Sequence, residues 1–466
     1  MTKKVVIIGG GIAGIYVLRN LLAKKDVVEE GLHLTLIKRE KSGWVSTCGL
    51  PFALRGWYEI DRTEINKPQF FLDQGIDFRT ETEVTRINSE ENSVTLKTGE
   101  EIKYDYLVIA TGRRPFIPTM VEKAGLEGVY TLNNEDDAEK IETALSMEGV
   151  KNAFVDGHEI GGMQAASALL ERGLKVTVLG RPPSLIASRL DPDMGDMLKE
   201  WMEKKGAKFI LERKKMITTV KGDGGRVKSV VMGEEEIPAD IVIISWGKKL
   251  EVRLARKAGI EIGENRGIVT DSAMHVKKRG RYINHVYAVG DCVEVIDSIT
   301  HRLRLNQAAS AAVVQAKVAT DNIFSDIRGQ LELYSSYEPS LGPTAIDFAG
   351  LLVGSVGVTT RAANRAGIKV MSGKATKLTK ARYFPGAKPL TLKLIFDAYT
   401  KKLIGAQMVA EATVAERVNE LAVAIYAGIT AEEMRNMERC YDPSLALLID
   451  VTIDAAEAAM GITAVY

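Results

Sequence analysis

The sequence predicts an α/β protein with two doubly wound βαβ units and a separate C-terminal α+β domain. The chain opens on a β-branched apolar run that leads into glycines with G-x-G-x-x-G spacing. Strand and helix patterns then alternate to about residue 330, which is typical of parallel sheets. From Ser335 onward short strand patterns dominate, and two helical patterns follow them. This order indicates a separate α+β domain.

The first βαβ unit begins the chain. Val5–Ile8 is continuously apolar, as a strand buried on both faces requires. Gly9, Gly11 and Gly14 follow, and Ile15–Ala23 predicts a helix. Glycines at this spacing permit a tight turn and let the backbone approach a pyrophosphate at the helix N-terminus. The strand before and the helix after them favour a dinucleotide site over an ordinary turn.

The next strand lacks the acidic residue that usually binds the adenosine ribose. Leu32–Ile37 is the predicted strand, and Lys38 and Arg39 follow it before Glu40. Either Glu40 reaches back to the ribose, or the ribose is held differently.

The second βαβ unit departs from the same pattern. It is predicted over residues 152–179, with Gly157 and Gly162 as the first and third glycines. Glu159 then occupies the place of the second glycine, where a carboxylate would repel a pyrophosphate. Gly180 and Arg181 replace the acidic residue after the following strand, and an arginine there can accommodate the 2′-phosphate of NADPH.

The other predicted elements follow from the same apolar periodicities. Ile102–Ala110 is strand-like and turns through Thr111-Gly112, and Val286–Cys292 is a strand followed by a turn. The remaining predictions are strands at Ala239–Trp246, which ends at Gly247, Ala345–Phe348, Ser355–Thr359, Lys369–Leu378 and Leu390–Asp397, and helices at Asn306–Ile323, Val414–Ala427 and Ser444–Ala459.

Composition excludes several classes of protein. The 466 residues suggest two to four domains, and 62 basic against 61 acidic residues give a net charge of +1, so no basic surface argues for nucleic acid. We find no apolar run long enough to span a membrane. Three cysteines argue against a disulfide framework and for a reducing compartment, which predicts a cytoplasmic protein. Five histidines without ligand spacing argue against a metal site.

With these motifs in place, the chain resembles the FAD-dependent pyridine-nucleotide–disulfide oxidoreductases, and within them the single-cysteine branch of coenzyme A-disulfide reductases, NADH oxidases and NAD(P)H polysulfide reductases. The resemblance covers nearly the whole chain. It rests on the fingerprint at Gly9–Gly14, CGLPF at Cys48–Phe52, ATG at Ala110–Gly112, YAVGDC at Tyr287–Cys292, RYFPGAKPL at Arg382–Leu390, IGAQMV at Ile404–Val409, and Tyr441-Asp442-Pro443.

The resemblance implies a discontinuous FAD domain over residues 1–118 and 248–330, an NAD(P)-type domain over 119–247, and a homodimerisation domain over 335–466. It implies that Cys48 lies beside the isoalloxazine, and that Tyr441 and Tyr383 reach into the active site of a partner subunit. The residues that it implies at the cofactors are Gly9, Gly11, Gly14, Glu40, Thr111, Gly112 and Asp291 for FAD, and Gly157, Gly162, Arg181 and Gly247 for NADH or NADPH.

Cys48 is the predicted redox centre. A thiol must ionise to attack a disulfide, and a helix that begins at Cys48 would favour the thiolate. Ala53 stands where a second thiol would complete a dithiol, so Cys48 must cycle through a mixed disulfide, a persulfide or a sulfenic acid. Cys292 is expected to pack in the FAD motif, and Cys440 is expected to point into the core rather than to resolve Cys48.

We therefore expect an FAD enzyme that reduces a small disulfide, polysulfide or related sulfur acceptor with NAD(P)H. Two alternatives stay open. Glu159 allows that nicotinamide binding is lost and that a redox protein partner reduces the flavin. An NADH oxidase is the other alternative, although the first fingerprint lacks the histidine of the water-forming oxidases and peroxidases.

Overall fold

The computed structural model describes residues 2–24, 31–181 and 184–462, which form two compact bodies. The first body comprises Met1–Ala53, Tyr58–Arg114 and Lys248–Ser340. The second body comprises Leu54–Trp57, Pro115–Gly247 and Leu341–Tyr466.

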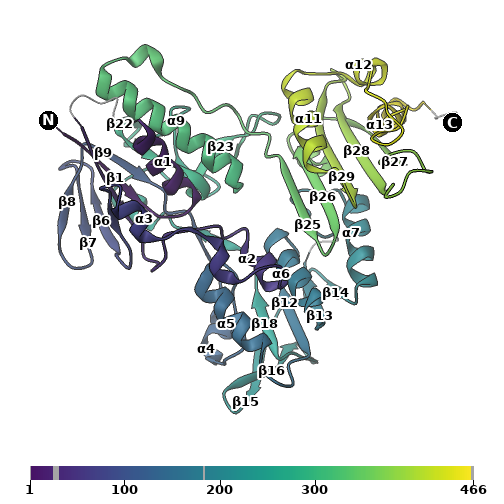
Figure 1. The fold of residues 1–466 in the computed structure, drawn as a ribbon, viewed down its shortest axis with the longest axis horizontal. Coiled ribbons are helices and arrows are strands. Elements are labelled where there is room, and N and C mark those ends of the chain that lie inside the picture. The colour runs from purple at the N-terminus through teal and green to yellow at the C-terminus, as the bar shows by residue number, and fades with distance from the viewer. Residues whose placement is uncertain (1, 25–30, 182–183, 463–466) are drawn as a thin grey trace. The chain divides into compact units, whose positions relative to one another are not determined.

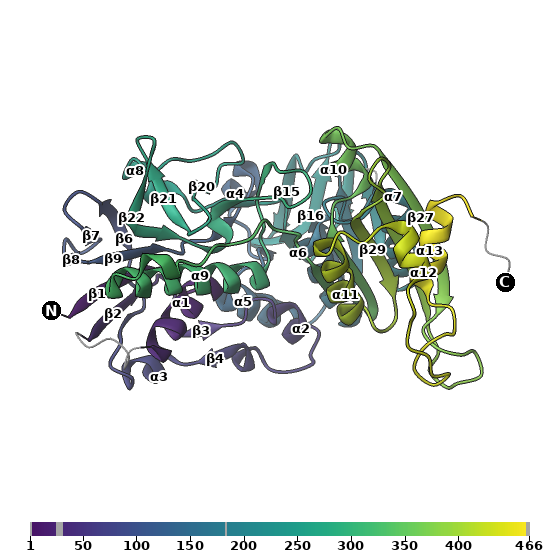
Figure 2. The same ribbon diagram turned by 90° about the horizontal axis from the view of Figure 1, so that it is seen from above.

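The first body is built on a six-stranded sheet of order β21-β22-β9-β1-β2-β5. β1 (Lys3–Ile8) is central and pairs in parallel with β2 (Leu32–Ile37) and with β9 (Tyr106–Ile109). Its residues Val5–Ile8 are buried, in agreement with a strand that is covered on both faces. α1 (Ile12–Ala23) packs against α9 (Ala309–Arg328), and both lie over this sheet (Figures 1 and 2).

Smaller sheets complete the first body, in the orders β6-β7-β8, β20-β23-β24 and β3-β4. Its other elements are β3 (Trp44–Val45), α2 (Leu50–Leu54), η2 (Ile60–Thr63), β4 (Glu64–Asn66), α3 (Pro68–Leu72), β5 (Asp77–Arg79), β6 (Val84–Asn88), β7 (Ser93–Leu96), β8 (Glu101–Lys103), β10 (Arg113–Pro115), β19 (Lys248–Leu250), α8 (Arg253–Lys257), β20 (Ile268–Val269), β21 (His275–Lys278), β22 (Arg281–Ala288), η3 (Gly290–Cys292), β23 (Val293–Ile296), β24 (Leu303–Arg304) and η4 (Leu331–Leu333).

The second body contains a parallel five-stranded sheet of order β11-β18-β12-β13-β14. β12 (Asn152–Asp156) is its middle strand, and α6 (Ile160–Glu171) follows it. The other elements of this region are α4 (Thr119–Ala124), β11 (Val129–Tyr130), α5 (Glu135–Leu145), β13 (Lys175–Gly180), α7 (Pro192–Lys204), β14 (Lys208–Leu211), β15 (Thr219–Asp223), β16 (Arg226–Met232), β17 (Glu235–Pro238) and β18 (Ile241–Ile244).

A second sheet in this body is antiparallel, with order β25-β26-β29-β28-β27. α13 packs on β27 and β28, and α11 packs on β26 and β29 (Figure 2). The elements are β25 (Thr344–Phe348), β26 (Leu351–Gly357), α10 (Thr360–Arg365), β27 (Val370–Leu378), β28 (Pro389–Asp397), β29 (Leu403–Ala410), α11 (Ala415–Tyr426), α12 (Ala431–Asn436) and α13 (Val451–Ala459). The predicted fold class, α/β followed by an α+β region, is confirmed.

Several predicted elements are wrong in their bounds. The strand predicted over Ile102–Ala110 is divided into β8 and β9, which belong to different sheets, and the helix predicted over Asn306–Ile323 is α9, Ala309–Arg328. Two further boundaries have an identifiable cause. The helix predicted from Ser444 begins only at Val451, because Asp450 is its N-cap and accepts a hydrogen bond from the Thr452 amide. The strand predicted to end at Thr359 ends at Gly357, because Thr359 caps α10 instead. In both cases a capping side chain determines the boundary.

Candidate functional site

The first nucleotide turn, Gly9–Gly14, joins β1 to α1, and its glycines have different surroundings. Gly9 has a φ of +114°, and a β-carbon there would overlap the carbonyl oxygen of Ala110. A β-carbon on Gly14 would overlap the carbonyl oxygen of Gly9. Gly14 is therefore required for the close approach of α1 to the end of β1, and Gly9 for the close approach of this turn to the segment after β9. A β-carbon on Gly11, in contrast, would meet nothing within 4 Å.

The N-terminus of α1 is suited to an anion. Gly11 is its N-cap, and no side chain caps the helix. The amide groups of a first helical turn have no partner within the helix, and the helix dipole is positive at this end. Open space at Gly11 in front of an uncapped helix is the geometry that a dinucleotide pyrophosphate requires, so these residues fit such a group.

Thr111, Gly112 and Asp291 lie at the same edge of the sheet as this turn. β9 is the parallel neighbour of both β1 and β22, so the segments that follow these three strands meet at the carboxyl edge. The Thr111 hydroxyl donates to the carbonyl of Glu251 at 2.6 Å, and Gly112 has a φ of +63°. The structure thus brings together residues that are up to 282 positions apart in the chain, as between Gly9 and Asp291.

Sequence analysis missed Arg113, which follows Gly112 directly. Its Nε lies 2.7 Å from Oδ2 of Asp291, and its guanidinium also donates to the side chain of Gln307. The negative charge of Asp291 is therefore matched by a cation of the same body. The signal available in the sequence was a basic residue directly after the Ala110–Gly112 motif.

Lys38, which directly follows β2, is engaged within the protein. Its Nζ donates to the carbonyl of Gly43 at 2.7 Å within the protein, and Arg39 pairs with Glu251 at 3.4 Å. Glu40 is exposed, three residues beyond the end of β2. It is thus the first side chain after this strand that carries an accessible carboxylate.

Cys48 is exposed, in the turn between β3 and α2. α2 begins at Leu50, two residues later, and has five residues. The phenol of Tyr58, which sequence analysis missed, donates to the carbonyl of Gly49 at 2.9 Å and so fixes the turn beside the thiol. Ala53 is buried, so the position of a second thiol is filled by a methyl group in the protein interior.

The other two cysteines differ from each other. Cys292 is buried, and burial raises the pKa of its thiol, as expected for a packing residue. The expectation that Cys440 points into the core is wrong, because this thiol is exposed. It lies in the irregular segment between α12 and α13.

The second nucleotide turn, Gly157–Gly162, keeps the framework of the first. A β-carbon on Gly157 would lie 2.5 Å from the carbonyl oxygen of Ser245, and one on Gly162 would overlap the carbonyl oxygen of Gly157. Glu159 is the N-cap of α6, with a φ of −88° and ψ of 177°, close to the −75° and −176° of Gly11. The backbone can therefore take the same path with a side chain at the second glycine position.

The carboxylate of Glu159 is bonded to the loop that follows β13. Its Oε2 accepts from the Ser188 hydroxyl at 2.5 Å, and no side chain caps α6. The same loop donates the amide of Ile186, which has a φ of +49°, to the carbonyl of His158 at 2.9 Å. The helix N-terminus is thus left for an anion, and the backbone of this turn fits a dinucleotide, while the carboxylate of Glu159 remains beside it.

The glycine and the larger side chain have changed places between the two units: Gly180 and His158 correspond to Lys38 and Gly10 of the first unit. A β-carbon on Gly180 would lie 2.7 Å from the β-carbon of His158. In the first unit the small residue is Gly10, whose β-carbon would lie 2.5 Å from Cδ of Lys38. The missing acidic residue after β13 is therefore explained, because the imidazole of His158 covers the end of that strand.

The remaining predicted residues of the second unit lie at the carboxyl ends of its strands. Arg181 follows β13, and Gly247 follows β18 with a φ of +148° and open space around it. The guanidinium of Arg181 stacks on the ring of Trp246 rather than extending from the end of β13.

Tyr383 and Tyr441 are exposed on two adjacent loops of the second body. Tyr383 lies between β27 and β28 and is 76% exposed, and Tyr441 lies between α12 and α13 and is 50% exposed. The amide of Ala381 donates to the carbonyl of Pro443 at 3.2 Å and joins the loops. Two exposed phenols on joined loops are compatible with contact to another molecule.

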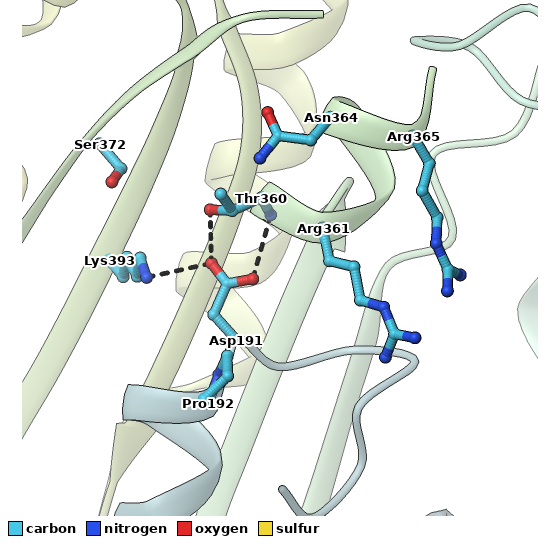
Figure 3. Close-up of a pocket in the computed structure, with 8 residues that line it drawn as sticks. All are labelled: Asp191, Pro192, Thr360, Arg361, Asn364, Arg365, Ser372 and Lys393. Atoms are coloured by element: carbon cyan, nitrogen blue, oxygen red, sulfur yellow. Dashed lines mark hydrogen bonds and ion pairs between the residues drawn. The ribbon is translucent and has the colours of Figure 1, made fainter. Parts of the chain in front are cut away.

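A cavity of about 570 Å³ lies elsewhere in the second body, between α7, α10, β27 and β28 (Figure 3). Asp191 forms its floor and accepts from the amide and hydroxyl of Thr360 at 3.0 and 2.7 Å. Lys393 lies 3.0 Å from the same carboxylate. In Figure 3 these groups are joined to one another by hydrogen bonds and an ion pair. We therefore interpret the cluster as a structural link between α7 and the C-terminal sheet.

Within residues 2–24, 31–181 and 184–462, no group of three or more His, Cys, Asp or Glu side chains could hold a metal ion. In this part of the chain no helix is both long and apolar enough to cross a membrane.

Two nucleotide turns, an exposed thiol in the first body and a C-terminal α+β region define a flavoprotein-type oxidoreductase. The chain matches the family described as "Pyridine nucleotide-disulphide oxidoreductase" over residues 3–313 and its dimerisation domain over residues 344–449. This protein belongs to that family, whose members use FAD and NAD(P)H.

Its relatives span almost the whole chain. An NADH oxidase of Methanocaldococcus jannaschii is 33% identical and matches over 98% of each protein. An NAD(P)H coenzyme A polysulfide/persulfide reductase of Pyrococcus horikoshii is 29% identical over 97% of each. Among solved structures, a NAD-dependent persulfide reductase from A. fulgidus is 30% identical with a TM-score of 0.89, covering 98% of this chain and 83% of that one. The predicted family and its single-cysteine branch are confirmed.

Proposed function

We propose that this protein is an FAD enzyme that uses NAD(P)H to reduce a small disulfide, a polysulfide or a related sulfur acceptor through Cys48. The observation that carries the proposal is an exposed Cys48 in the same body as the first nucleotide turn, with buried Ala53 at the position of a second thiol. The similar proteins from Pyrococcus horikoshii and A. fulgidus are named as polysulfide or persulfide reductases, which supports this substrate class.

The cofactor assignments follow from the two turns. Gly9, Gly11 and Gly14 hold the FAD pyrophosphate at α1, because the helix is uncapped and the space at Gly11 is open. We assign Thr111, Gly112 and Asp291 to the same cofactor because they lie at the same sheet edge, and Glu40 to its ribose because its carboxylate is accessible. Gly157, Gly162, Arg181 and Gly247 are assigned to NADH or NADPH.

The chemistry of the chain's own residues centres on one sulfur. The Cys48 thiolate attacks a substrate disulfide, forms a mixed disulfide and releases one substrate thiolate. FAD held at Gly9, Gly11 and Gly14 would supply the electron pair that reduces this mixed disulfide, with NAD(P)H as the source of the electrons. The second substrate thiolate then leaves and needs a proton. We propose that the phenols of Tyr441 and Tyr383 supply it from the partner subunit of a homodimer.

We place the enzyme in the cytoplasm. All three cysteines are free, which fits a reducing compartment.

The test compares Cys48→Ser with Cys440→Ser as the matched exposed-thiol control. The anaerobic enzyme is mixed first with NADH or NADPH and then with coenzyme A disulfide or polysulfide, and flavin absorbance is followed. We expect Cys48→Ser to keep FAD and its reduction by NAD(P)H but to lose disulfide turnover by at least ~10³-fold, because the attacking thiolate is absent. Full turnover in this variant would refute the assigned nucleophile.

Glu159 favours a second candidate, an electron-transfer flavoprotein that receives electrons from a redox protein partner. The carboxylate stands at the position of the second glycine of the dinucleotide turn. The same anaerobic experiment separates the two functions, because flavin bleaching by NADH or NADPH supports the reductase and no bleaching by either supports the second candidate. Stoichiometric oxygen use at high turnover would instead indicate an NADH oxidase.

A further inference from the structure

Arg181 crosses the end of the central strand of the second nucleotide unit. It follows β13, while Trp246 lies two residues beyond β18, and the sheet order is β18-β12-β13. The guanidinium carbon of Arg181 lies 3.7 Å from the centroid of the Trp246 ring. Its Nη2 lies 3.9 Å from Oδ1 of Asp156, the last residue of β12. The side chain thus runs from β13 across β12 toward β18.

This direction matters because the two phosphate groups of a bound dinucleotide occupy different places. In a doubly wound sheet the adenosine ribose is held at the end of the second strand, and the pyrophosphate rests on the helix that follows the first strand. Here these are the end of β13 and the N-terminus of α6. His158 covers the end of β13 at Gly180. The Arg181 side chain does not stay at this end but extends over the end of β12, the strand that leads into α6.

Two buried donors at this point have no partner among the described residues. They are Nε of Arg181 and Nε1 of Trp246. The contact between Arg181 and Asp156 is longer than a hydrogen bond, and burial raises the pKa of this carboxyl to about 6. These two N–H groups are enclosed by protein atoms, but the Arg181 side chain is still 24% exposed, so the open part of its guanidinium can donate to a ligand rich in oxygen acceptors.

The charges around the second nucleotide turn also favour a role of Arg181 at the pyrophosphate. Glu159 brings a carboxylate to the turn where a pyrophosphate approaches, and its bond to Ser188 leaves the charge in place. Arg189 attracts this carboxylate, and the guanidinium of Arg181 adds a second cation on the side of β12, next to the same turn. The face of Trp246 holds the planar guanidinium in that orientation, because an aromatic ring attracts a stacked cation.

We propose that Arg181, held across the crevice by Trp246, binds the pyrophosphate common to NADH and NADPH rather than the 2′-phosphate that only NADPH carries. Trp246 is then a positioning residue that acts through Arg181. The inference rests on the proposed function in one respect, that the second unit takes NAD(P)H.

The test measures binding and not turnover. The oxidised FAD-loaded enzyme is titrated with NAD⁺ and with NADP⁺ by calorimetry, for wild type, Arg181→Ala, Arg181→Lys and the control Arg361→Ala, an exposed arginine of the same body. We expect Arg181→Ala to weaken both dinucleotides by about 10–100-fold, since a charge-assisted bond to phosphate contributes about 1.5–3 kcal/mol. Arg181→Lys is expected to lie between, and Arg361→Ala to match wild type.

A double-mutant cycle tests the role of Trp246. Trp246→Leu is expected to weaken both dinucleotides in the wild-type background but to have no further effect in Arg181→Ala, and Trp246→Phe, which keeps an aromatic face, is expected to bind more tightly than Trp246→Leu. Equal effects of Trp246→Leu in both backgrounds would show a role independent of Arg181. FAD absorbance and thermal unfolding report whether each variant is folded.

Two results overturn the inference and leave the proposed function standing. They are a loss in Arg181→Ala that is confined to NADP⁺, and unchanged binding of both dinucleotides. If wild type binds neither dinucleotide, the inference and the proposed electron donor both fail.

Discussion

The two glycines Gly11 and Gly14 provide a prediction that separates cofactor binding from folding. Both belong to the first nucleotide turn, but a β-carbon at Gly11 meets open space whereas one at Gly14 overlaps the carbonyl oxygen of Gly9. Gly14→Ala therefore forces α1 away from β1. We expect it to lower the free energy of unfolding of the FAD-free protein by about 2–4 kcal/mol, the cost of overpacking a rigid backbone contact.

Gly11→Ala is expected to act on FAD alone. Its φ of −75° and ψ of −176° are extended backbone that alanine adopts without strain, so the free energy of unfolding should change by less than about 1 kcal/mol. The new methyl group occupies the space in front of the uncapped helix. Losing one charge-assisted bond there costs about 1.5–3 kcal/mol, which weakens FAD binding by about 10–100-fold.

The assay strips FAD from both variants, measures thermal unfolding of the FAD-free proteins, and then titrates FAD while following the quenching of its fluorescence. Wild-type FAD affinity in Gly11→Ala would refute the assignment of this turn to the pyrophosphate. A loss of FAD-free stability in Gly11→Ala equal to that in Gly14→Ala would refute the distinction between open and packed glycines.

Three further predictions concern the second body. Glu159→Gly should raise NAD(P)H affinity about five-fold, because a carboxylate ~7 Å from a phosphate at an effective dielectric constant of ~40 costs about 1 kcal/mol; calorimetry that shows unchanged or weaker binding would count against the repulsion. Burial lowers the pKa of His158 from 6.5 to about 4, so its contribution to stability is present above pH 6.5 and is lost as the pH falls toward 4. Burial raises the pKa of Asp156 from 3.8 to about 6, so its contribution is present below pH 3.8 and is lost as the pH rises toward 6. The two groups therefore change the free energy of unfolding in opposite directions between pH 4 and 6.5. Relative to wild type, chemical denaturation should show stability that falls with rising pH in His158→Gln and rises in Asp156→Asn, by on the order of 2–3 kcal/mol each. The same pH dependence in both variants would contradict this. Asp191→Ala should lower the free energy of unfolding by about 1–3 kcal/mol because it leaves the amide and hydroxyl of Thr360 without their acceptor, while Lys393 keeps its ion pair with Asp193 at 2.8 Å; a melting temperature equal to that of wild type would exclude the structural link.

Much of the fold was predictable because local patterns agree with it. Val5–Ile8 is apolar on both faces, and the structure buries it in the middle of a parallel sheet. The bounds of Leu32–Ile37 agree with those predicted. Some boundaries failed because a single capping residue decided them, as at Thr359 and Asp450. A cap works through one side-chain bond, which an apolar period of several residues does not detect.

The positions of the two nucleotide turns in the fold were predictable from the sequence, but the contacts of their side chains were not. The glycine spacing and the CGLPF motif are local, so the sequence alone identified the two turns and the thiol. The exposure of Cys440 was not predictable, because whether a helix packs over an irregular segment depends on distant parts of the chain.

By itself the sequence determined the two βαβ units, the lone Cys48 and the departure at Glu159, because each is encoded within a few neighbouring residues. Only the tertiary structure decided that the Ser188 hydroxyl donates to the carboxylate of Glu159 and that the guanidinium of Arg181 stacks on the ring of Trp246. Arg181 and Trp246 are 65 positions apart in the chain, and they meet because β13 and β18 flank β12 in one parallel sheet. Strand order is a property of the whole sheet, and it places side chains together that no local pattern relates.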